Sequence, residues 1–544
     1  MSAIRTRSFW HWGFEEEFPD EQARRALAQQ AAFMVPGAGE LSLEPLPSLE
    51  GVELPAARIA VPHALSAFTT DMTRDRILHA AGKGYRDVLR AFRRDFRGAP
   101  DLVAYPENEE HLAALFELCA REGAALVPFG GGTSVVSGVT YEGPPRPVVS
   151  VDLGRLDQLL EVDGASRLVR LRAGASGPRL EAQLAEHGLS LRFFPQSFEL
   201  STLGGWIATR AGGHFATGYT HIDDLVAGLR MLTPAGAYET RTLPASGAGP
   251  DPNRWVLGSE GTLGVVTEAT LRAFVRPVFR ASATVMFATL ERAAAAARGI
   301  AQAYLWPSNC RVLDPAEALL SGVSGDGRCA LLLGFESADH ELESSMERAL
   351  KIAVRAGGAT DGARYRRGGE KARGDRGGAE TYRAAFLRGP YLQSALVSLG
   401  VLVDTFETAC TWSRFEALDR EVRAALAEAM APMGGGLVSL RFSHVYPDGP
   451  APYYTFGVRA QRGRELEQHE ALKRAASDAL SRTGGTITHH HAVGRLHRPW
   501  YDRERPELFA RALGAAKREL DPAGIMNPGV LILPHARAAG ESSE

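Results

Sequence analysis

Three glycine-rich segments constrain the folding of this chain more than any other feature. Glycine makes up 58 of its 544 residues, a share well above the usual value of about 7%. The excess gathers at residues 128–138 (PFGGGTSVVSG), 195–226 and 258–271 (GSEGTLGVVTEATL). Glycine is required where the backbone turns tightly or approaches a ligand closely. Three such segments in one chain predict a ligand site walled by backbone.

The first glycine segment directly follows a short apolar run, ALVPF at 125–129, which predicts a buried strand. Exposed N–H groups, together with the Thr133 and Ser134 hydroxyls, suit a diphosphate. The segment is not a Walker loop, because it lacks G-K-[ST], and it is not a G-x-G-x-x-G turn that opens a helix. A tight surface turn is the alternative, although three glycines between apolar residues are costly for a turn alone.

Composition excludes several classes of protein. The 61 Lys and Arg residues against 64 Asp and Glu give a net charge of −3, so nucleic acid is not an expected partner. The four cysteines are far apart and form no C-x-x-C pair, so we expect neither a disulfide framework nor a structural zinc site. No apolar run reaches the length of a membrane span. We therefore expect a cytoplasmic protein, peripheral to a membrane at most.

The pattern along the chain predicts an α+β protein in four parts. These are an N-terminal helical segment (1–95), a ligand-binding domain (96–275), a second domain (276–486) and a C-terminal segment (487–544) that packs back on the first domain. Helices are predicted at residues 22–33, 84–96, 176–188, 290–304, 340–356 and 506–520, and after Asn108, which can cap a helix with a regular apolar face. Strands are predicted at 125–129, 148–153, 168–174, 329–335 and, around the histidines, in TITHHHAVG.

The order and separation of the glycine segments resemble the vanillyl-alcohol-oxidase/PCMH flavoprotein superfamily. Later landmarks are similar to its alkyldihydroxyacetonephosphate synthase branch: FLRGPYL, DTFETACTW, PYYTFG and HHHAVGRL. The resemblance runs from about residue 100 to the C-terminus. It implies a PCMH-type FAD-binding domain and an α/β cap domain with an antiparallel sheet.

By this resemblance the glycine segments hold FAD, and we expect the flavin to be bound non-covalently. The cofactor-binding residues that it implies are Pro128, Gly130, Gly131, Gly132, Thr133, Ser134, Gly138, Pro195, Ser197, Ser201, Thr202, Gly204, Gly205, Ala208, Thr209, Arg210, Glu260, Gly261, Gly264 and Val265.

His489, His490 and His491 are the most conspicuous polar run in the chain. From the residues alone, an active site, a metal site and a polar surface are all open, because a metal needs further ligands that a sequence does not show. The resemblance favours a proton-handling wall beside the flavin, with no metal. It also implies Tyr454 as the catalytic tyrosine, with the adjacent Tyr453 as second choice.

Three arginines are implied in substrate binding: Arg388 as the anchor of a substrate phosphate, with Arg441 and Arg210 facing the site. A guanidinium matches a phosphate monoester through two parallel hydrogen bonds. From the residues alone, a surface ion pair is an equally good reading of Arg388.

Two departures from the family pattern stand out. Ala81 occupies a position where the synthases have a histidine, with His79 two residues earlier. Residues 311–334 also lack the long amphipathic insertion of the animal enzymes, which weakens the case for membrane attachment.

The resemblance implies an FAD-dependent exchange of the acyl chain of acyl-dihydroxyacetone phosphate for a fatty alcohol, without net redox change, in ether-lipid biosynthesis. The alternative is an FAD-dependent 2-hydroxy-acid or alcohol dehydrogenase or oxidase. We expect lipid substrates, weak association with a membrane surface at most, and a homodimer.

Overall fold

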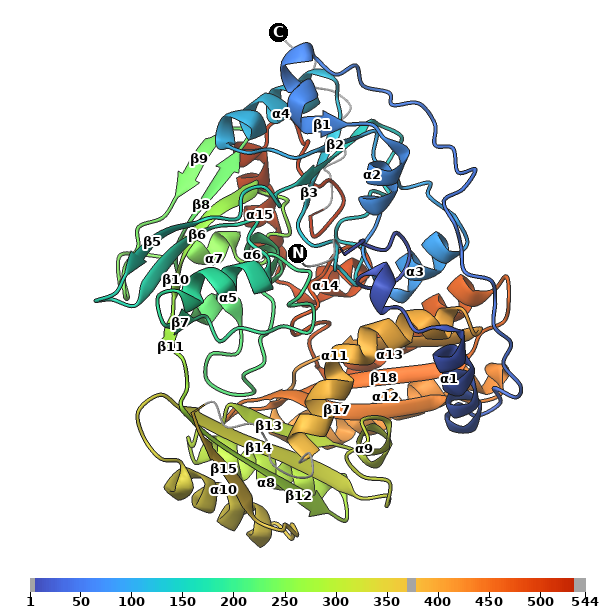
Figure 1. Cartoon of the computed structure of the whole chain (residues 1–544), viewed down its shortest axis with the longest axis vertical. Coiled ribbons are helices and arrows are strands. Elements are labelled where there is room, and N and C mark those ends of the chain that lie inside the picture. Colours follow the sequence, from blue (N-terminus) through green and yellow to red (C-terminus); the bar gives the residue numbers. More distant parts are fainter. Residues whose placement is uncertain (1–4, 369–377, 533–544) are drawn as a thin grey trace.

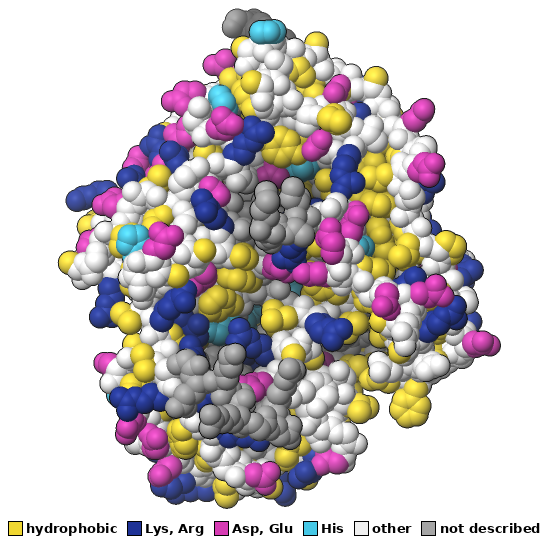
Figure 2. Space-filling view, viewed as in Figure 1, with side chains coloured by type: hydrophobic (Ala, Val, Ile, Leu, Met, Phe, Trp, Pro, Cys, Tyr) yellow, Lys and Arg dark blue, Asp and Glu magenta, His cyan; other side chains and the backbone are white. Residues whose placement is uncertain are grey.

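The computed structural model of the chain describes residues 5–368 and 378–532, which form two lobes (Figure 1). The end of the predicted C-terminal segment, residues 533–544, lies outside the described residues. In the space-filling view (Figure 2), acidic and basic side chains are interspersed over the visible face, as the small net charge leads one to expect.

The N-terminal segment is helical but extended between its helices. Its α-helices are α1 (Glu21–Met34), α2 (Thr73–Leu78) and α3 (Tyr85–Phe92). The Asp20 side chain caps α1 by accepting a hydrogen bond from the Ala23 N–H. Buried residues of α3, among them Val88 and Leu89, belong to the same apolar cluster as the core of the lower lobe.

The upper lobe contains two sheets. The first has the order β1 (Thr69–Thr70), β2 (Leu102–Ala104), β4 (Val148–Asp152), β3 (Ala125–Phe129), and β2, β4 and β3 are parallel. The second is antiparallel, in the order β5 (Leu159–Asp163), β6 (Leu168–Arg172), β10 (Val265–Arg272), β8 (Val226–Thr233), β9 (Gly236–Glu239). A short pair, β7 (Leu189–Ser190) and β11 (Phe274–Val275), leads toward the lower lobe.

Helices of the upper lobe follow local signals in the sequence. Asn108 caps α4 (Glu109–Arg121) by accepting a hydrogen bond from the His111 N–H, as the sequence predicts. The next α-helices of this lobe along the chain are α5 (Gly177–Ala185), α6 (Leu203–Thr209) and α7 (Asn253–Val256). Helix α6 lies within the second glycine segment, so that segment is part helix and part loop.

The lower lobe is built on one seven-stranded antiparallel sheet. Its order is β15 (Ala363–Arg367), β12 (Phe279–Phe287), β14 (Cys329–Ser337), β13 (Asn309–Leu313), β17 (Leu437–Val445), β18 (Pro450–Arg459), β16 (Val401–Glu407). Helices α8 (Leu290–Gln302), α9 (Pro315–Leu320), α10 (Glu343–Arg355), α11 (Gly378–Val397), α12 (Trp412–Met430) and α13 (Glu465–Thr483) pack against this sheet or one another.

The chain finally returns to the upper lobe through α14 (Arg498–Glu504) and α15 (Glu507–Leu520), drawn in red in Figure 1. Met526 then pairs in parallel with Leu126 of β3. The Asn527 amide donates to the carbonyls of Gly138 and Glu260 at 3.0 and 2.7 Å. The C-terminal segment is thus anchored on two of the glycine segments.

One predicted element is absent from the described part of the chain: residues 486–493, around the three histidines, form bends rather than a strand. Among the described residues, no helix combines the length and the apolar character needed to cross a bilayer.

Candidate active site

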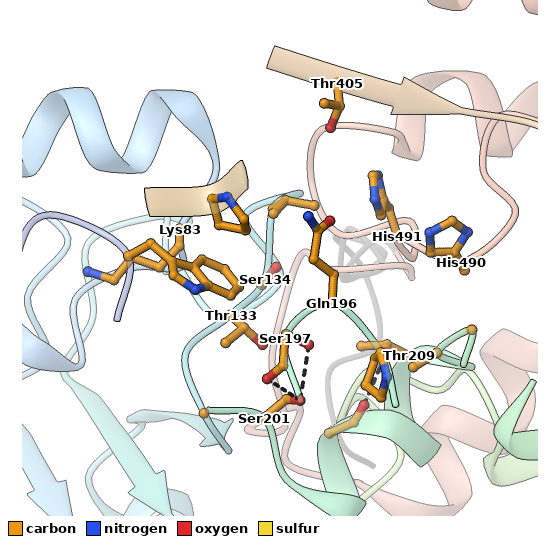
Figure 3. Close-up of a pocket in the computed structure, with 18 of the residues that line it drawn as sticks. Lys83, Thr133, Ser134, Gln196, Ser197, Ser201, Thr209, Thr405, His490 and His491 are labelled. Carbon is orange, nitrogen blue, oxygen red and sulfur yellow. Dashed lines mark hydrogen bonds between the residues drawn. The ribbon is translucent and has the colours of Figure 1, made fainter. Parts of the chain in front are cut away.

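The cavity at the junction of the two lobes joins the first two glycine segments to the cap sheet. Its wall includes residues 130–134 and parts of 195–213, and, from the lower lobe, residues of α11, β13, β16, β17 and β18. In Figure 3, Thr133, Ser134, Ser197 and Ser201 lie across the cavity from His490, His491 and Thr405. Backbone and hydroxyl groups therefore face imidazoles across one space.

The glycine wall is too closely packed for side chains. A Cβ on Gly131 would stand 2.0 Å from the Leu200 carbonyl oxygen, and one on Gly130 would stand 2.4 Å from Thr202 Oγ1. Thr202 also caps α6, because its hydroxyl accepts a hydrogen bond from the Gly205 N–H at 3.3 Å. The first two glycine segments thus form one continuous backbone surface.

Just over half of the cofactor-binding residues implied by the resemblance line this cavity. Those that do are Gly130, Gly131, Gly132, Thr133, Ser134, Pro195, Ser197, Ser201, Thr202, Gly205 and Thr209. Those that do not are Pro128, Gly138, Gly204, Ala208, Arg210, Glu260, Gly261, Gly264 and Val265. Several of the second group pack behind the wall: a Cβ on Gly261 would meet Pro128 Cγ at 2.8 Å, and one on Gly204 would meet Ala173 at 3.0 Å.

Glu260 and Arg210 have structural partners rather than positions in this cavity. The buried Glu260 carboxylate accepts hydrogen bonds from the N–H groups of Val493 and Gly494 at 2.9 and 2.8 Å. Burial raises the pKa of Glu260 to about 7, although these two donors oppose the shift. Arg210 ends α6 and is paired with Asp223 at 2.8 Å. Both residues help fix the loops that surround the cavity.

The three histidines are held by a single buried carboxylate, that of Glu407 at the end of β16. It accepts hydrogen bonds from the N–H groups of His489 and His491 at 2.6 and 3.0 Å, and from the Thr488 hydroxyl at 2.6 Å. The N–H of His490 contacts it at 3.2 Å. A strand sends successive N–H groups to opposite edges, so it cannot direct three of them at one carboxylate. This explains why the predicted strand is not formed.

Glu407 is ionised in this environment. Burial alone would raise its pKa, but the Thr488 hydroxyl and the N–H groups of the three histidines donate hydrogen bonds to the charged form, and the pKa of this carboxyl lies below its ordinary range. The bound carboxylate fixes the backbone of the loop, and the loop in turn fixes the three rings.

His490 and His491 line the cavity, whereas His489 lies behind them. The His489 Nε2 atom is 2.8 Å from the Tyr446 hydroxyl, and its Nδ1 is 3.1 Å from Nδ1 of His490. Burial lowers the pKa of all three rings, that of His491 to about 3. The imidazoles are therefore neutral near pH 7, and each can accept or donate a proton.

The imidazole of His444, which is buried on β17, completes this cluster. Ring nitrogens of His444, His489 and His490 all lie within 4.8 Å of one another, a spacing that could hold a metal ion. These rings already have hydrogen-bond partners: His444 contacts the Gly213 carbonyl at 3.3 Å and the Ser443 hydroxyl at 3.1 Å. The His444 ring packs against those of His489 and His490, and the contact between the Nδ1 atoms of His489 and His490 links His489 to the cavity.

Of the two adjacent tyrosines on β18, the structure places Tyr453 in the cavity and Tyr454 on the opposite face of the sheet. The Tyr453 hydroxyl donates to Thr405 Oγ1 at 3.0 Å, and its ring lies beside those of His490 and His491. Tyr454 is fully buried, stacks on Phe406 and donates to Asp419 at 3.1 Å. The sequence interpretation is thus displaced by one residue.

Burial raises the pKa of Tyr453, and the adjacent Arg441 and the Thr405 hydroxyl only partly oppose this shift. The phenol is therefore protonated near neutral pH and is available as a proton donor. Arg441 lies 3.8 Å above its ring.

Of the three arginines implied by the sequence, only Arg441 lines the cavity. Arg388 is exposed on α11, although its neighbours Phe386 and Pro390 do line it. Arg441 is buried and paired with Glu317 at 2.8 Å. A further arginine that the sequence analysis did not single out, Arg311 on β13, also lines the cavity.

Arg311 is a cation without a neutralising partner in the described part of the chain. Its guanidinium donates to the Asn309 side chain at 2.8 Å and to the His214 carbonyl at 3.1 Å, and within residues 5–368 and 378–532 it forms no ion pair. Burial lowers its pKa, and Arg441 lowers it further. A half-buried guanidinium with no carboxylate partner among the described residues is stabilised when an anion joins it, so this end of the cavity suits an anionic group.

Sequence reasoning missed other residues of the wall. Trp12 and Lys83 from the N-terminal segment, Thr405, and His444 all line the cavity. The family-pattern histidine position is occupied by Ala81, and His79 does not compensate at the cavity, because its Nε2 contacts Asp152 at 3.0 Å. Thr405 lies in the landmark DTFETACTW, which did not single it out, and Trp12, Lys83 and His444 lie outside the landmarks, so the sequence offered no signal for their positions.

The cavity fits FAD. A wall of glycine backbone that admits no Cβ, edged by the hydroxyls of Thr133, Ser134 and Ser201, can lie against a diphosphate and its sugar. The residues that would hold the cofactor are therefore those of the first two glycine segments that line the cavity.

Two family models match the chain. Residues 100–241 match an FAD binding domain, and residues 276–531 match the C-terminal domain of FAD linked oxidases. A solved structure of alkyldihydroxyacetonephosphate synthase superposes with a TM-score of 0.78 at 24% identity, over 96% of this chain and 98% of that one. The predicted FAD cofactor and α+β PCMH-type fold are confirmed.

Curated relatives agree with the landmarks in the sequence. The chain is 30% identical to an alkyldihydroxyacetonephosphate synthase of Caenorhabditis elegans, over 84% of this chain and 80% of the relative. It is 28% identical to the same enzyme of Dictyostelium discoideum, over 86% and 79% of the two chains. It is also 25% identical to a glycolate oxidase subunit of Bacillus subtilis, over 81% and 91%.

Proposed function

The chain belongs to the alkyldihydroxyacetonephosphate synthase family, and from this membership we propose that it exchanges the acyl chain of acyl-dihydroxyacetone phosphate for a fatty alcohol. The product would be an ether lipid precursor, and the exchange would cause no net redox change.

One observation carries the proposal: a single cavity brings the FAD wall together with a protonated tyrosine, neutral imidazoles and two arginines. The exchange needs a place for a phosphate, a group that moves protons, and a flavin. Each requirement is met by residues that face the same space.

The phosphate anchor in this proposal is the pair Arg311 and Arg441, in place of Arg388. Arg441 is already balanced by Glu317, so the net positive charge at this end of the cavity is that of Arg311. A phosphate monoester would satisfy the unpaired guanidinium through charge-assisted hydrogen bonds. The dihydroxyacetone part would then lie between the arginines and the glycine wall.

Proton handling is assigned to Tyr453, His490 and His491. The Tyr453 hydroxyl is protonated and could donate to the departing carboxylate, while a neutral imidazole could take a proton from the substrate carbon or from the incoming alcohol. We assign the histidines to this role rather than to a metal. When bound, FAD supplies an electrophilic ring beside these groups. The hydrogen bonds to Glu407 keep the imidazoles in place throughout.

The alternative function is a 2-hydroxy-acid dehydrogenase or oxidase, and the similarity to a glycolate oxidase subunit keeps it open. Such an enzyme binds a small carboxylate and passes electrons to an acceptor. The guanidinium of Arg311 could bind the carboxylate of a hydroxy acid. Oxidation of a hydroxy acid, however, requires no second substrate such as a fatty alcohol.

The deciding experiment incubates the purified, FAD-loaded protein with acyl-dihydroxyacetone phosphate and radiolabelled hexadecanol and analyses the lipid product. Labelled alkyl-dihydroxyacetone phosphate, with release of the fatty acid, is the expected result. A parallel incubation contains lactate or glycolate and a redox dye. Dye reduction there, with no labelled ether lipid in the first incubation, would overturn the proposal in favour of the dehydrogenase.

Because both long-chain substrates partition into membranes, we also propose that the protein associates weakly with a membrane surface. We further propose that it forms a homodimer. Exposed apolar side chains such as Phe33 and Leu508 are candidates for the membrane contact. Co-sedimentation with phosphatidylcholine vesicles and light scattering would test the two statements separately.

A further inference from the structure

Residues 5–18 form a strap that crosses the junction of the two lobes. Arg5 is paired with Glu199 of the upper lobe at 2.6 Å. The Trp12 N–H donates to the Ser394 hydroxyl of α11 at 3.1 Å, and the Trp12 side chain lines the cavity. The strap lies outside both matched family models, which cover residues 100–241 and 276–531.

The strap holds a half-buried lysine against the first glycine segment. The Lys83 side chain lines the cavity, and its ammonium donates to the strap carbonyls of Ser8 and Phe9, each at a long 3.4 Å. The backbone N–H of Lys83 donates to the Ser134 carbonyl at 2.7 Å, which fixes Lys83 beside the loop 130–134. Figure 3 shows Lys83 on the same side as Thr133 and Ser134.

Lys83 has no counter-ion among the described residues. Asp87 acts on it through space but makes no ion pair with it, and burial lowers the pKa of Lys83 to about 7. Three cationic side chains line the described cavity, and the other two, Arg311 and Arg441, belong to the cap sheet. Lys83 is thus the cation of the cofactor end.

A second cation, Arg7 of the strap itself, contacts the same loop. Its guanidinium donates to the Gly131 carbonyl at 2.7 Å, and within the described residues it too forms no ion pair. Burial lowers its pKa as well. Two half-buried cations without a carboxylate partner among the described residues are stabilised when an anion joins them, and they flank the loop 130–134, whose backbone N–H groups suit a diphosphate.

We propose that Lys83 and Arg7, positioned by the strap, are part of the FAD site and balance the negative charge of the FAD diphosphate. The strap would thereby couple cofactor binding to the junction of the lobes. This inference rests on FAD as the cofactor and not on the synthase reaction.

The test is the affinity of the apoprotein for oxidised FAD, measured by flavin fluorescence at several salt concentrations. Lys83→Met keeps the apolar stem and removes the charge, and we expect it to weaken FAD binding at least tenfold and to flatten its salt dependence. Lys83→Arg should bind within about threefold of the wild type. Arg25→Gln, on the exposed face of α1, removes a charge from the same segment without contact to the cavity and serves as control.

Arg7→Gln provides an independent variant in case Lys83→Met fails to fold, and circular dichroism with the melting temperature would check folding of each variant. Folded Lys83→Met or Arg7→Gln protein that binds FAD as tightly as wild type, with the same salt dependence, would overturn the proposal. Such a result would leave the synthase function untouched, whereas failure of the lipid exchange in a wild type that binds FAD normally would contradict only the function.

Discussion

At the scale of single residues, the site depends on which of two neighbours faces the cavity. Tyr453 contacts Thr405 and the histidines, whereas Tyr454 donates to Asp419 in the core. Replacing each tyrosine by phenylalanine removes the same hydroxyl group from adjacent positions of one strand, so the two variants test which tyrosine handles the proton.

Tyr453→Phe should reduce kcat by about 10²–10⁴-fold with little change in KM, because only the proton-handling hydroxyl is removed. Tyr454→Phe should keep its turnover and lose about 1 kcal/mol of stability with the hydrogen bond to Asp419. Steady-state kinetics and thermal melts of both variants would check this. The reverse pattern, an active Tyr453→Phe and an inactive Tyr454→Phe, would refute the assignment.

The arginines allow a similar comparison. Arg311→Met should raise KM for the phosphorylated substrate about tenfold or more, since a charge-assisted contact contributes roughly 1.5–3 kcal/mol. Arg388→Met should behave as wild type, because Arg388 is exposed and does not line the cavity. Substrate titrations of the two FAD-loaded variants would decide, and a selective KM defect in Arg388→Met would restore the original interpretation.

At the scale of elements, the sequence predicted what local interactions determine. Helix α4 has its Asn108 cap and its apolar face within one stretch of chain, and the glycine loop after β3 is equally local. The facing of β18 was not predictable, because both faces of this strand are buried and the usual alternation of polar and apolar residues is missing. A shift of one residue then exchanges Tyr453 with Tyr454.

The strand predicted around the three histidines is wrong for a different reason. Its conformation is set by Glu407, more than 80 residues away in sequence, and no local pattern announces that contact. The role of Arg311 likewise depends on its surroundings in the folded protein, where no carboxylate of the described residues pairs with it. A sequence does not reveal this.

Glu407→Gln should disorganise this loop. In the variant, some backbone N–H groups that donate to a carboxylate oxygen in the wild type would face the N–H₂ group of the amide, which cannot accept. We therefore expect the free energy of unfolding to fall by at least about 1–3 kcal/mol and most of the turnover to be lost. Glu504→Gln is the matched control, because Glu504 is exposed and accepts from Thr486 and Ile487 of the same loop, away from the cavity. Calorimetry and turnover assays would test both, and a Glu407→Gln variant with wild-type melting and activity would contradict the assigned role of this carboxylate.

At the scale of the whole molecule, buried neutral imidazoles should make the protein sensitive to acid. Burial lowers the pKa of seven described histidines: His11, His214, His444, His489, His490, His491 and His497. Below about pH 6.5 the unfolded chain protonates these rings while the folded protein does not, so stability falls as the pH falls. Each ring that stays neutral in the folded protein lowers the free energy of unfolding by about 1.4 kcal/mol for every pH unit below its pKa in the unfolded chain.

Three buried carboxyl groups, those of Glu260, Asp87 and Asp314, act in the opposite direction, because burial raises the pKa of each. The pKa of Glu260 rises to about 7 and that of Asp87 to about 6, so these groups bind protons in the folded state and gain stability as the pH falls. The histidines outnumber them, and we expect the melting temperature to drop steeply between pH 6.5 and 4. Differential scanning calorimetry across this range would check the expectation, and a constant melting temperature would contradict the neutral state of the histidine cluster.

The whole-molecule claim is that one cavity carries out an exchange in which the flavin is oxidised before and after each turnover. The most direct measurement is product formed per flavin by the FAD-loaded protein under anaerobic conditions with no electron acceptor, given acyl-dihydroxyacetone phosphate and fatty alcohol. We predict many equivalents of alkyl-dihydroxyacetone phosphate per flavin and an unchanged oxidised flavin spectrum at the end. At most one equivalent of product, accompanied by lasting bleaching of the flavin, would contradict the account.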